Sequence, residues 1–323
     1  MSSPLVSILI PCHNAGPYVA ATLESAFAQT WTDREVILVD DGSTDDSRAV
    51  ARRFEPRGLR VIDQANRGAA AARNTARRAA RGRWLQFLDA DDLLHPEKLA
   101  RQVAVASAVP AGTVLTGRWG RFTRDPAEVA FPPDNPLFSD LAPRAFLQAW
   151  ASHDCMMHPA AWLVPREVAD AAGPWDERLS LNDDGEYFTR VVAAATDVRW
   201  CGEAVSYYRS GLPGSLSGQR SRRHLESAFL ALQLITEQLV RLEDSTAMRR
   251  AAADLCQRFA YDYYPAAPDL VAAAEGRARR FGGSRLAPLG GRGFHLLRRV
   301  VGWKAARRLQ VALGRFPSSA PRP

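Results

Sequence analysis

The sequence has 323 residues, of which 46% are hydrophobic and 24% charged. This length supports a core without a disulfide or metal, and the composition excludes collagen-like and wholly disordered proteins. The net charge of +7 is uneven: residues 277–323 contain twelve Arg or Lys and no acid, whereas residues 1–276 contain 30 basic and 35 acidic residues. A mildly acidic main part argues against a nucleic-acid partner.

The cysteines and the N-terminal residues indicate a reducing compartment. The four cysteines lie far apart, with no Cys-x-x-Cys pair, and the N-terminus has no apolar leader. The most apolar window, residues 103–115, contains Ser107 and Pro110. It is also shorter than the roughly 20 residues that cross a bilayer. We therefore expect a cytoplasmic protein without a membrane span.

The first 110 residues alternate apolar strands with helices. Strands are predicted at residues 6–10, 36–39, 59–62 and 84–88, and helices at residues 18–30, 68–80 and 97–107. The strands are continuous apolar runs, which are typical of a parallel sheet with helices on both faces. Ligands bind such sheets beyond the carboxyl ends of the strands.

The rest of the chain is less regular. Strands are predicted at residues 112–122 and 161–164, a strand pair at residues 198–200 and 204–208, and helices at residues 184–194 and 222–242. Residues 131–143 contain four prolines, which favours an irregular loop.

Polar residues follow three of the early strands, and we expect them to meet in one crevice. They are Pro11-Cys12-His13-Asn14, Asp40-Asp41-Gly42 and Asp89-Ala90-Asp91-Asp92. One or two carboxylates, together with substrate phosphates and water, are what Mg²⁺ requires. Asp89-x-Asp91 on its own is within chance for this composition, and a solvated turn or helix cap is the alternative.

Four further features have both a structural and a functional interpretation. The run from Asp40 to Asp46 is either a turn before a helix or a carboxylate site for a base or ribose. Arg73 lies in a basic helix that is either solvated or directed at a phosphate. His13 is either a loop residue or a ring that packs near a base. Asp184, at a helix start, either complements the helix dipole or acts as a general base.

Several other enzyme classes lack their motifs here. The chain has no G-x-G-x-x-G after the first strand, no G-x-x-x-x-G-K-[ST], no G-x-S-x-G and no H-E-x-x-H. The dehydrogenase, P-loop NTPase, α/β-hydrolase and zincin interpretations therefore have no motif support.

Four motifs in sequence order resemble the family-2 glycosyltransferases of GT-A fold. They are the runs Val6 to Asn14, Val39 to Asp45, Asn66 to Asn74 and Phe87 to Asp92. The resemblance is firm over residues 4–108, looser to about residue 210 and absent from the tail. It implies an α/β fold, with a Rossmann-like, mostly parallel sheet flanked by helices and a helical C-terminal extension.

The resemblance also implies an activity and site residues. The activity is inverting, metal-assisted transfer of a sugar from a nucleotide-diphosphate sugar to an acceptor hydroxyl, in bacterial-type surface polysaccharide or glycan assembly. By position, Pro11, His13 and Asp41 would lie at the nucleotide base, with Asp40 nearby. Arg73 would lie near the donor, Asp89 at the ribose or sugar and Asp91 on Mn²⁺ or Mg²⁺, and Asp184 would be the catalytic base. The acceptor would be a glycan, lipid-linked or other hydroxyl.

The sequence departs from the family pattern at two places. Some GT-A enzymes add a late histidine to the metal site, but residues 208–215 contain none. The metal would then rest on Asp91, diphosphate and water. The chain also lacks the Gln-x-x-Arg-Trp motif of processive synthases, which favours transfer of a single sugar. A catalytically inactive nucleotide-sugar binder is the alternative.

The chain is divided by this interpretation into three parts. Residues 1–218 would form the GT-A domain, with a nucleotide-binding half at 1–110 and an acceptor half at 111–218. Residues 219–276 would form a helical extension and residues 277–323 a basic tail.

The basic tail is a candidate for peripheral contact with the inner face of the membrane. A helix over residues 294–316 would insert Leu297 and Trp303 among anionic lipids. As one straight helix its arginines spread widely around the axis, so its amphipathicity is poor. A disordered or partner-bound tail is the alternative.

Overall fold

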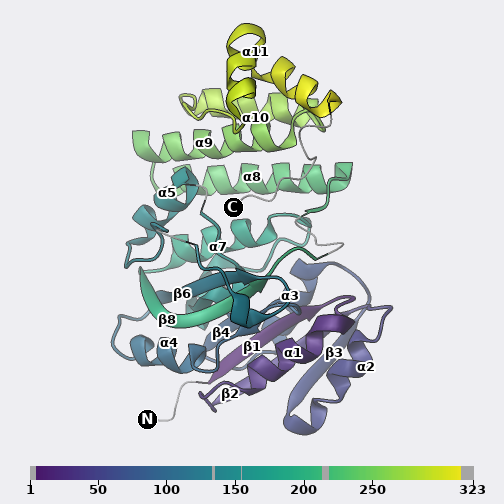
Figure 1. Ribbon diagram of the computed structural model, residues 1–323. Helices are drawn as coiled ribbons and strands as arrows, with labels where there is room; N and C mark the ends of the chain where they lie inside the picture. Colours follow the sequence, from purple (N-terminus) through teal and green to yellow (C-terminus); the bar gives the residue numbers. More distant parts are fainter. Residues whose placement is uncertain (1–4, 133–134, 154, 213–217, 314–323) are drawn as a thin grey trace. The chain divides into compact units, whose positions relative to one another are not determined.

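The computed structural model describes residues 5–132, 135–153, 155–212 and 218–313. The chain forms two compact units, residues 1–213 and residues 214–323. Each unit is described separately (Figure 1).

The first unit is built on one sheet with strand order β3-β2-β1-β4-β7-β6-β8-β5. The strands are β1 (Val6–Cys12), β2 (Arg34–Asp41), β3 (Leu59–Gln64), β4 (Trp84–Phe87), β5 (Leu93–Leu94), β6 (Thr113–Phe122), β7 (Trp162–Pro165) and β8 (Asp197–Arg209). The neighbours among β3, β2, β1 and β4 are parallel, β7 is antiparallel to β4 and β6, and β8 is parallel to β6. The predicted mostly parallel α/β sheet is confirmed.

Helices cover this sheet. They are α1 (Gly16–Phe27), α2 (Ser47–Arg52), α3 (Ala69–Ala79), α4 (Lys98–Ala106), α5 (Pro143–His153), α6 (Arg166–Ala172) and α7 (Asp183–Ala194). Every residue of β1 is buried, as a central strand packed on both faces requires. Val19 and Leu23 of α1 belong to the same core cluster as Ile8 and Ile10 of β1. α3 packs against β1 and β2. The polar residues at the carboxyl ends of these strands are therefore held by a buried core of sheet and helices.

An aromatic cluster joins β4 to α7. The rings of Trp175 and Tyr187 stack with centroids 4.0 Å apart, and Phe87 of β4 meets Trp175 edge-on at 5.2 Å. Both Trp175 and Tyr187 are fully buried. Aromatic pairs of this kind contribute about 0.5–1.5 kcal/mol beyond their buried area. The cluster fixes the start of α7 close to the end of β4.

The predicted strand pair at residues 198–200 and 204–208 is wrong, because β8 runs unbroken over both. Residues 197–201 and 205–209 pair with β6 in two registers, shifted between Gly117 and Arg118. A Cβ on Gly117 would lie 2.2 Å from the Ala204 carbonyl oxygen. Glycine in β6 therefore gives room for the bulge of β8, so the strand continues where the sequence suggests a turn.

The second unit is helical. It contains α8 (Arg222–Leu242), α9 (Thr246–Tyr263), α10 (Pro268–Arg280) and α11 (Arg292–Ala312). The bounds of α8 are those predicted. Arg277 of α10 is buried and donates to Thr236 Oγ1 of α8 at 2.9 Å. None of the helices described here is both long and apolar enough to cross a membrane. Of the predicted basic tail, residues 314–323 lie outside the described residues.

Candidate active site

Arg73 joins the end of β4 to the start of α7. Its guanidinium donates through Nη2 to Asp89 Oδ1 and through Nη1 to Asp183 Oδ2, both at 2.7 Å. It lies 4.5 Å from the ring centroid of Trp175 and is only 5% exposed. The two carboxylates raise the pKa of Arg73 against the opposing effect of burial. The arginine thus stays charged and holds two acidic segments together.

Asp184 lies next to this ion pair and is half-buried. Its Oδ1 accepts a hydrogen bond from the Gly185 backbone N–H at 2.8 Å. Burial, followed by the charge of Asp183, raises the pKa of Asp184 to about 6, against the opposing charge of Arg73. A carboxylate with this pKa is mostly ionised at neutral pH and is a stronger base than an ordinary aspartate.

Asp91 presents a carboxylate that forms no ion pair with the described residues. Burial, then the charges of Asp92 and Asp89, raises its pKa to about 8, and Arg209 opposes this shift. A divalent cation removes such a cost, because it favours the ionised form. The described residues contain no group of three or more His, Cys, Asp or Glu side chains that could hold a metal. One carboxylate fits Mg²⁺ or Mn²⁺ that is bound mainly through substrate phosphates and water.

Asp92 is fully buried and holds the loop that carries Asp91. Its Oδ1 accepts from the Arg209 backbone N–H at 2.8 Å, and its Oδ2 lies 2.9 Å from His158 Nδ1. Burial lowers the pKa of His158 to about 3, so the imidazole is neutral. His158 then donates to Asp92 from Nδ1 and accepts the Ser206 hydroxyl at Nε2, 2.8 Å away. This network ties the loop to β8.

Arg209, at the end of β8, lies where the sequence lacks the late histidine. Its Nε donates to the Asp91 carbonyl at 2.9 Å, and its guanidinium lies 4.4 Å from the Phe122 ring and 5.1 Å from the Tyr18 ring. Arg209 and Arg124 line a pocket of about 410 Å³ beside the Asp91 loop. Of residues 208–215, positions 213–215 lie outside the described residues.

The ends of β1 and β2 form a second polar region. Asp41 is 2% exposed, and its carboxylate accepts from Gln64 Nε2 at 2.7 Å and from the N–H groups of Arg67 and Gly68 at 2.9 and 2.8 Å. Asp41 therefore holds the loop before α3. His13 is exposed, and its Nδ1 donates to the Asp41 carbonyl at 2.9 Å.

Pro11 and Asp40 lie behind this surface. Pro11 is buried in β1. Asp40 is 2% exposed, and its Oδ2 accepts from the Ser43 N–H at 3.2 Å. Its Oδ1 is buried without a hydrogen-bond partner among the residues of the described ranges. Pro11 and Asp40 are therefore both buried, whereas His13 is exposed.

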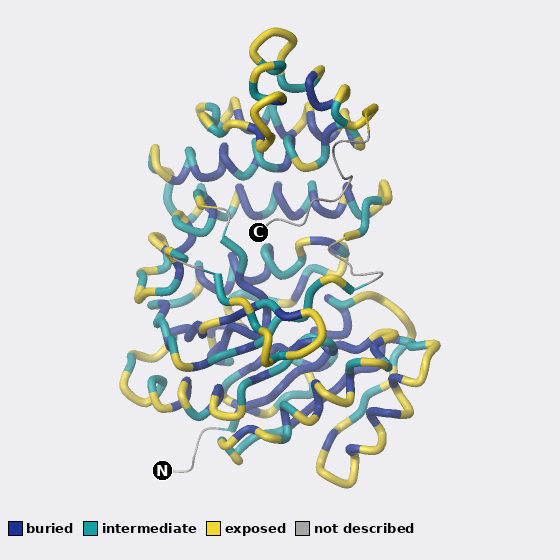
Figure 2. Tube along the Cα trace, in the orientation of Figure 1, coloured by how far each residue is buried: buried dark blue, intermediate teal, exposed yellow. Residues whose placement is uncertain are grey.

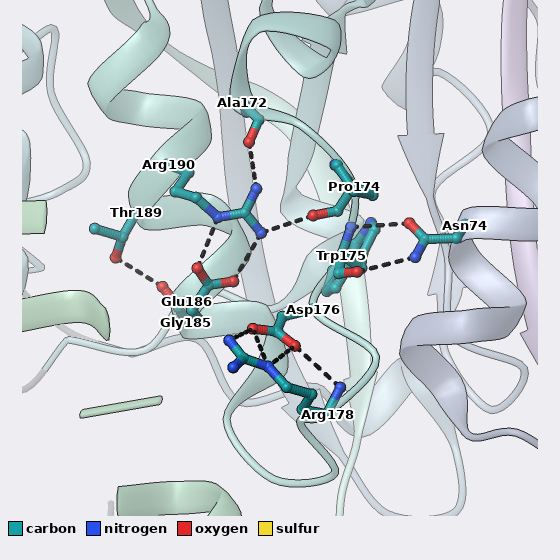
Figure 3. A network of polar contacts seen from close by, with 10 residues as sticks. All are labelled: Asn74, Ala172, Pro174, Trp175, Asp176, Arg178, Gly185, Glu186, Thr189 and Arg190. Carbon is teal, nitrogen blue, oxygen red and sulfur yellow. Dashed lines mark hydrogen bonds and ion pairs between the residues drawn. The ribbon is translucent and has the colours of Figure 1, made fainter. Parts of the chain in front are cut away.

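The segment before α7 is held from two sides (Figure 3). Asn74 of α3 makes two hydrogen bonds to the backbone of Trp175, at 2.9 and 2.8 Å. Arg190 of α7 donates to the Pro174 carbonyl at 2.9 Å and to Glu186 Oε1 at 2.7 Å. These contacts set the position at which α7 begins, and with it the position of Asp184.

Residues 7–170 match the sequence model described as Glycosyl transferase family 2. The match covers half of the chain. The chain belongs to glycosyl transferase family 2.

The chain is similar to two curated proteins and one solved structure that are described here. The uncharacterized glycosyltransferase EpsJ of Bacillus subtilis is 31% identical over 66% of this chain and 63% of its own length. The Escherichia coli UDP-Glc:alpha-D-GlcNAc-diphosphoundecaprenol beta-1,3-glucosyltransferase WfgD is 36% identical over 32% of this chain and 42% of its own. TarS 1–349 of S. aureus, solved with UDP-GlcNAc, is 16% identical with a TM-score of 0.72, covering 96% of this chain and 92% of that chain. The TarS likeness shows the GT-A fold, and the chain spans less than two thirds of the length of the first curated relatives.

Within this family 2 protein, the predicted residues fall into two groups. The first group lies between the end of β4 and the start of α7 and consists of Arg73, Asp89, Asp91 and Asp184. The second group lies at the ends of β1 and β2 and consists of Pro11, His13, Asp40 and Asp41. Sequence reasoning placed Asp92 in the strand-end cluster but gave it no role, and it assigned no role to His158, Ser206 and Arg209. These three come from distant segments, so no local signal connects them to Asp92.

Proposed function

We propose that this family 2 glycosyltransferase moves a single sugar from a nucleotide-diphosphate sugar to a hydroxyl of a glycan or lipid-linked acceptor, with inversion. The observation that carries this proposal is the double ion pair of Arg73, which holds Asp89 and Asp183 at 2.7 Å each. It brings the strand end of the nucleotide-binding half to the segment that carries Asp184. A donor at one side and a base at the other would then face a common reaction centre.

Asp184 is the proposed catalytic base. It would accept the proton of the acceptor hydroxyl as the hydroxyl oxygen bonds to the anomeric carbon and the bond from that carbon to the diphosphate oxygen breaks. Attack from the face opposite the leaving diphosphate inverts the anomeric carbon, as in other displacements through an oxocarbenium-like centre. The pKa of Asp184, about 6, suits this task at neutral pH.

Asp91 is the proposed residue for Mn²⁺ or Mg²⁺. When bound, the cation neutralises charge on the departing diphosphate. The free carboxylate of Asp91, and the absence of a metal cage among the described side chains, support a cation that binds together with its donor. Arg209, whose Nε is held by the Asp91 carbonyl, would place a second positive charge near the diphosphate.

His13 is the proposed contact for the nucleotide base. It is exposed at the end of β1, and Asp41 holds the adjoining loop through three hydrogen bonds. Pro11 and Asp40 are buried behind it, so we assign them support of the base site. TarS was solved with UDP-GlcNAc, which supports a nucleotide-sugar donor for this chain.

Membrane proximity of the acceptor is part of the proposal. WfgD is named for a diphosphoundecaprenol-linked acceptor, and TuaG of Bacillus subtilis is named as a putative teichuronic acid biosynthesis glycosyltransferase. A lipid-linked acceptor would be presented at a membrane surface.

A donor panel tests the function. Purified protein with Mn²⁺ is incubated with nucleotide sugars that differ in base and sugar, and release of the nucleoside diphosphate is measured with and without candidate acceptors. We expect turnover of at least one donor. Tight, metal-assisted binding without release from any donor would instead identify an inactive nucleotide-sugar binder.

A further inference from the structure

The exposed aliphatic side chains gather in one segment of the second unit. Across the described ranges, the large hydrophobic residues that are exposed are Leu289, Leu296, Val300, Val301, Leu309, Val311 and Leu313. Their exposed fractions run from 41% for Val311 to 81% for Val300. Figure 2 shows this region as largely exposed. Five of the seven lie in α11 and the other two flank it, and exposed apolar side chains gathered in one segment mark an interaction surface.

The opposite side of α11 is firmly packed. Trp303 lies edge-on to Tyr261 and Tyr264 of the α9 region, with centroids 4.9 and 5.2 Å away. Lys304 forms an ion pair with Glu275 of α10 at 2.7 Å. These contacts fix the inner side of the second piece of α11, and buried Phe294 lies on the inner side of the first piece. They also correct the expectation that Trp303 inserts into lipid, because its ring packs against two tyrosines of the same unit.

Arg307 adds to this packing. Its Nη2 donates to the Leu289 carbonyl at 2.9 Å, and its guanidinium lies 4.7 Å from the ring centroid of Phe294. Arg307 is 1% exposed. Two of the tail's positive charges, those of Lys304 and Arg307, are therefore committed to the inner side of α11.

A break at Gly302 changes the amphipathicity expected for this segment. Gly302 has φ 78° and ψ 161°, so α11 consists of two helical pieces at this point. In the first piece, Leu296, Arg299 and Val300 lie four, seven and eight residues after Arg292. At 3.6 residues per turn they lie within an arc of about 100°. All four are exposed, so this face mixes arginine with aliphatic residues.

The charge of this segment indicates which kind of partner binds the exposed face of α11. Arg292, Arg299 and Arg308 are exposed, and residues 277–323 contain no acid that could balance them. A second copy docking through the same face would bring arginine against arginine. A nucleic acid would leave the leucine and valine side chains without a partner, since bases stack on aromatic rings. An anionic lipid surface satisfies both the positive charge and the aliphatic residues.

We propose that the outward face of α11 binds anionic phospholipid membranes, with Leu296 and Val300 inserted at the level of the headgroups and Arg292 and Arg299 on lipid phosphates. This surface is argued from the second unit alone and does not depend on the proposed sugar transfer. It gives the enzyme a place at the membrane without a spanning helix.

The test uses the full chain and flotation with vesicles. Wild-type protein should float with vesicles of equal phosphatidylglycerol and phosphatidylcholine and stay behind with pure phosphatidylcholine. The double variant R292Q/R299Q should bind about 30-fold more weakly, because each basic residue near an anionic surface contributes about 1 kcal/mol to binding. L296S/V300S should weaken binding by about tenfold or more.

A matched control removes two exposed arginines from the first unit. R48Q/R53Q changes the net charge equally and should float like the wild type. Release of nucleoside diphosphate from a soluble donor should be unchanged in all three variants, which separates this proposal from the proposed function. Absence of binding to phosphatidylglycerol vesicles at low salt, or equal binding by all variants, would overturn the proposal. Light scattering that shows a dimer abolished by L296S/V300S, without vesicle binding, would assign the face to a second copy instead.

Discussion

Arg73 is a buried cation between carboxylates that come from distant parts of the chain. Asp89 lies 16 residues and Asp183 110 residues further along. Sequence reasoning placed Arg73 near the donor because it occurs in a family motif. In the structure both Nη atoms are bonded to protein carboxylates, so Arg73 positions two acidic segments, and its place near the donor stays a prediction. Among the residues that the structure describes, Asp184, the neighbour of Asp183, forms no ion pair of its own.

Replacing Asp184 with asparagine tests the proposed base. Asparagine keeps the shape but does not accept a proton, so D184N should lower kcat by about 10²- to 10⁴-fold. Donor binding, measured by calorimetry with Mn²⁺ and nucleoside diphosphate, should be unchanged. D170N is the control, because Asp170 is exposed and pairs only with Arg77 in the described contacts. Full activity of D184N on the true acceptor would rule out this base.

The pH dependence follows from the same residue. Burial and Asp183, with a smaller effect of Asp89, raise the pKa of Asp184 to about 6, while Arg73 opposes them. Asp184 in turn makes a small contribution to the raised pKa of Tyr208, about 12, which is mainly due to burial. The base must be ionised, so kcat/KM should fall about tenfold per pH unit below pH 6. A rate that stays level down to pH 4.5 would contradict the assignment.

Asp91 is tested by ligand-induced stabilisation rather than by activity. Nucleoside diphosphate with Mn²⁺ should raise the Tm of the wild type more than nucleoside diphosphate alone, because a ligand bound to the native state stabilises it by mass action. D91N should lose this metal-dependent increment and keep the metal-independent one. An equal Mn²⁺ effect in both proteins would show that the cation is held elsewhere.

At the scale of elements, the early βα units were well predicted because their signals are local. Continuous apolar runs predicted β1 to β4 within a few residues, and the spacing of apolar residues predicted α8 with its observed bounds. β5, of two residues, has no such signal and exists only through its pairing with β8. The bulge of β8 was missed because it depends on Gly117 in another strand.

The pairing of β6 with β8 at Gly117 gives a stability prediction. In G117A the new Cβ would lie 2.2 Å from the Ala204 carbonyl oxygen, so the strands must move apart. We expect a loss of about 1–3 kcal/mol in the free energy of unfolding, measured by urea denaturation. G276A, whose Cβ meets only Arg279 at 3.8 Å in helix α10, should be neutral or slightly stabilising. A G117A protein as stable as the wild type would show that this contact does not constrain β6.

At the scale of the whole molecule, charge and hydrophobicity divide between the two units. The acidic cluster of Asp89, Asp91 and Asp184 belongs to the first unit, and the exposed aliphatic residues and the basic segment 277–313 belong to the second. The sequence indicated this charge division directly. It did not indicate which basic residues face outward, because that depends on the break at Gly302 and on the packing of Trp303 against α9.

The order and spacing of the strand-end motifs were sufficient, without coordinates, for the family, the fold class and the list of candidate acids. These features reside in short segments, where local propensity and residue type carry the information. Tertiary structure alone decided which acids are paired and which are free: Asp183 with Arg73, Asp92 with His158, and Asp91 with no ion-pair partner among the described residues. The reason is physical. A carboxylate's pKa and availability depend on burial and on charges brought from segments far apart in the chain, and only folding sets those distances.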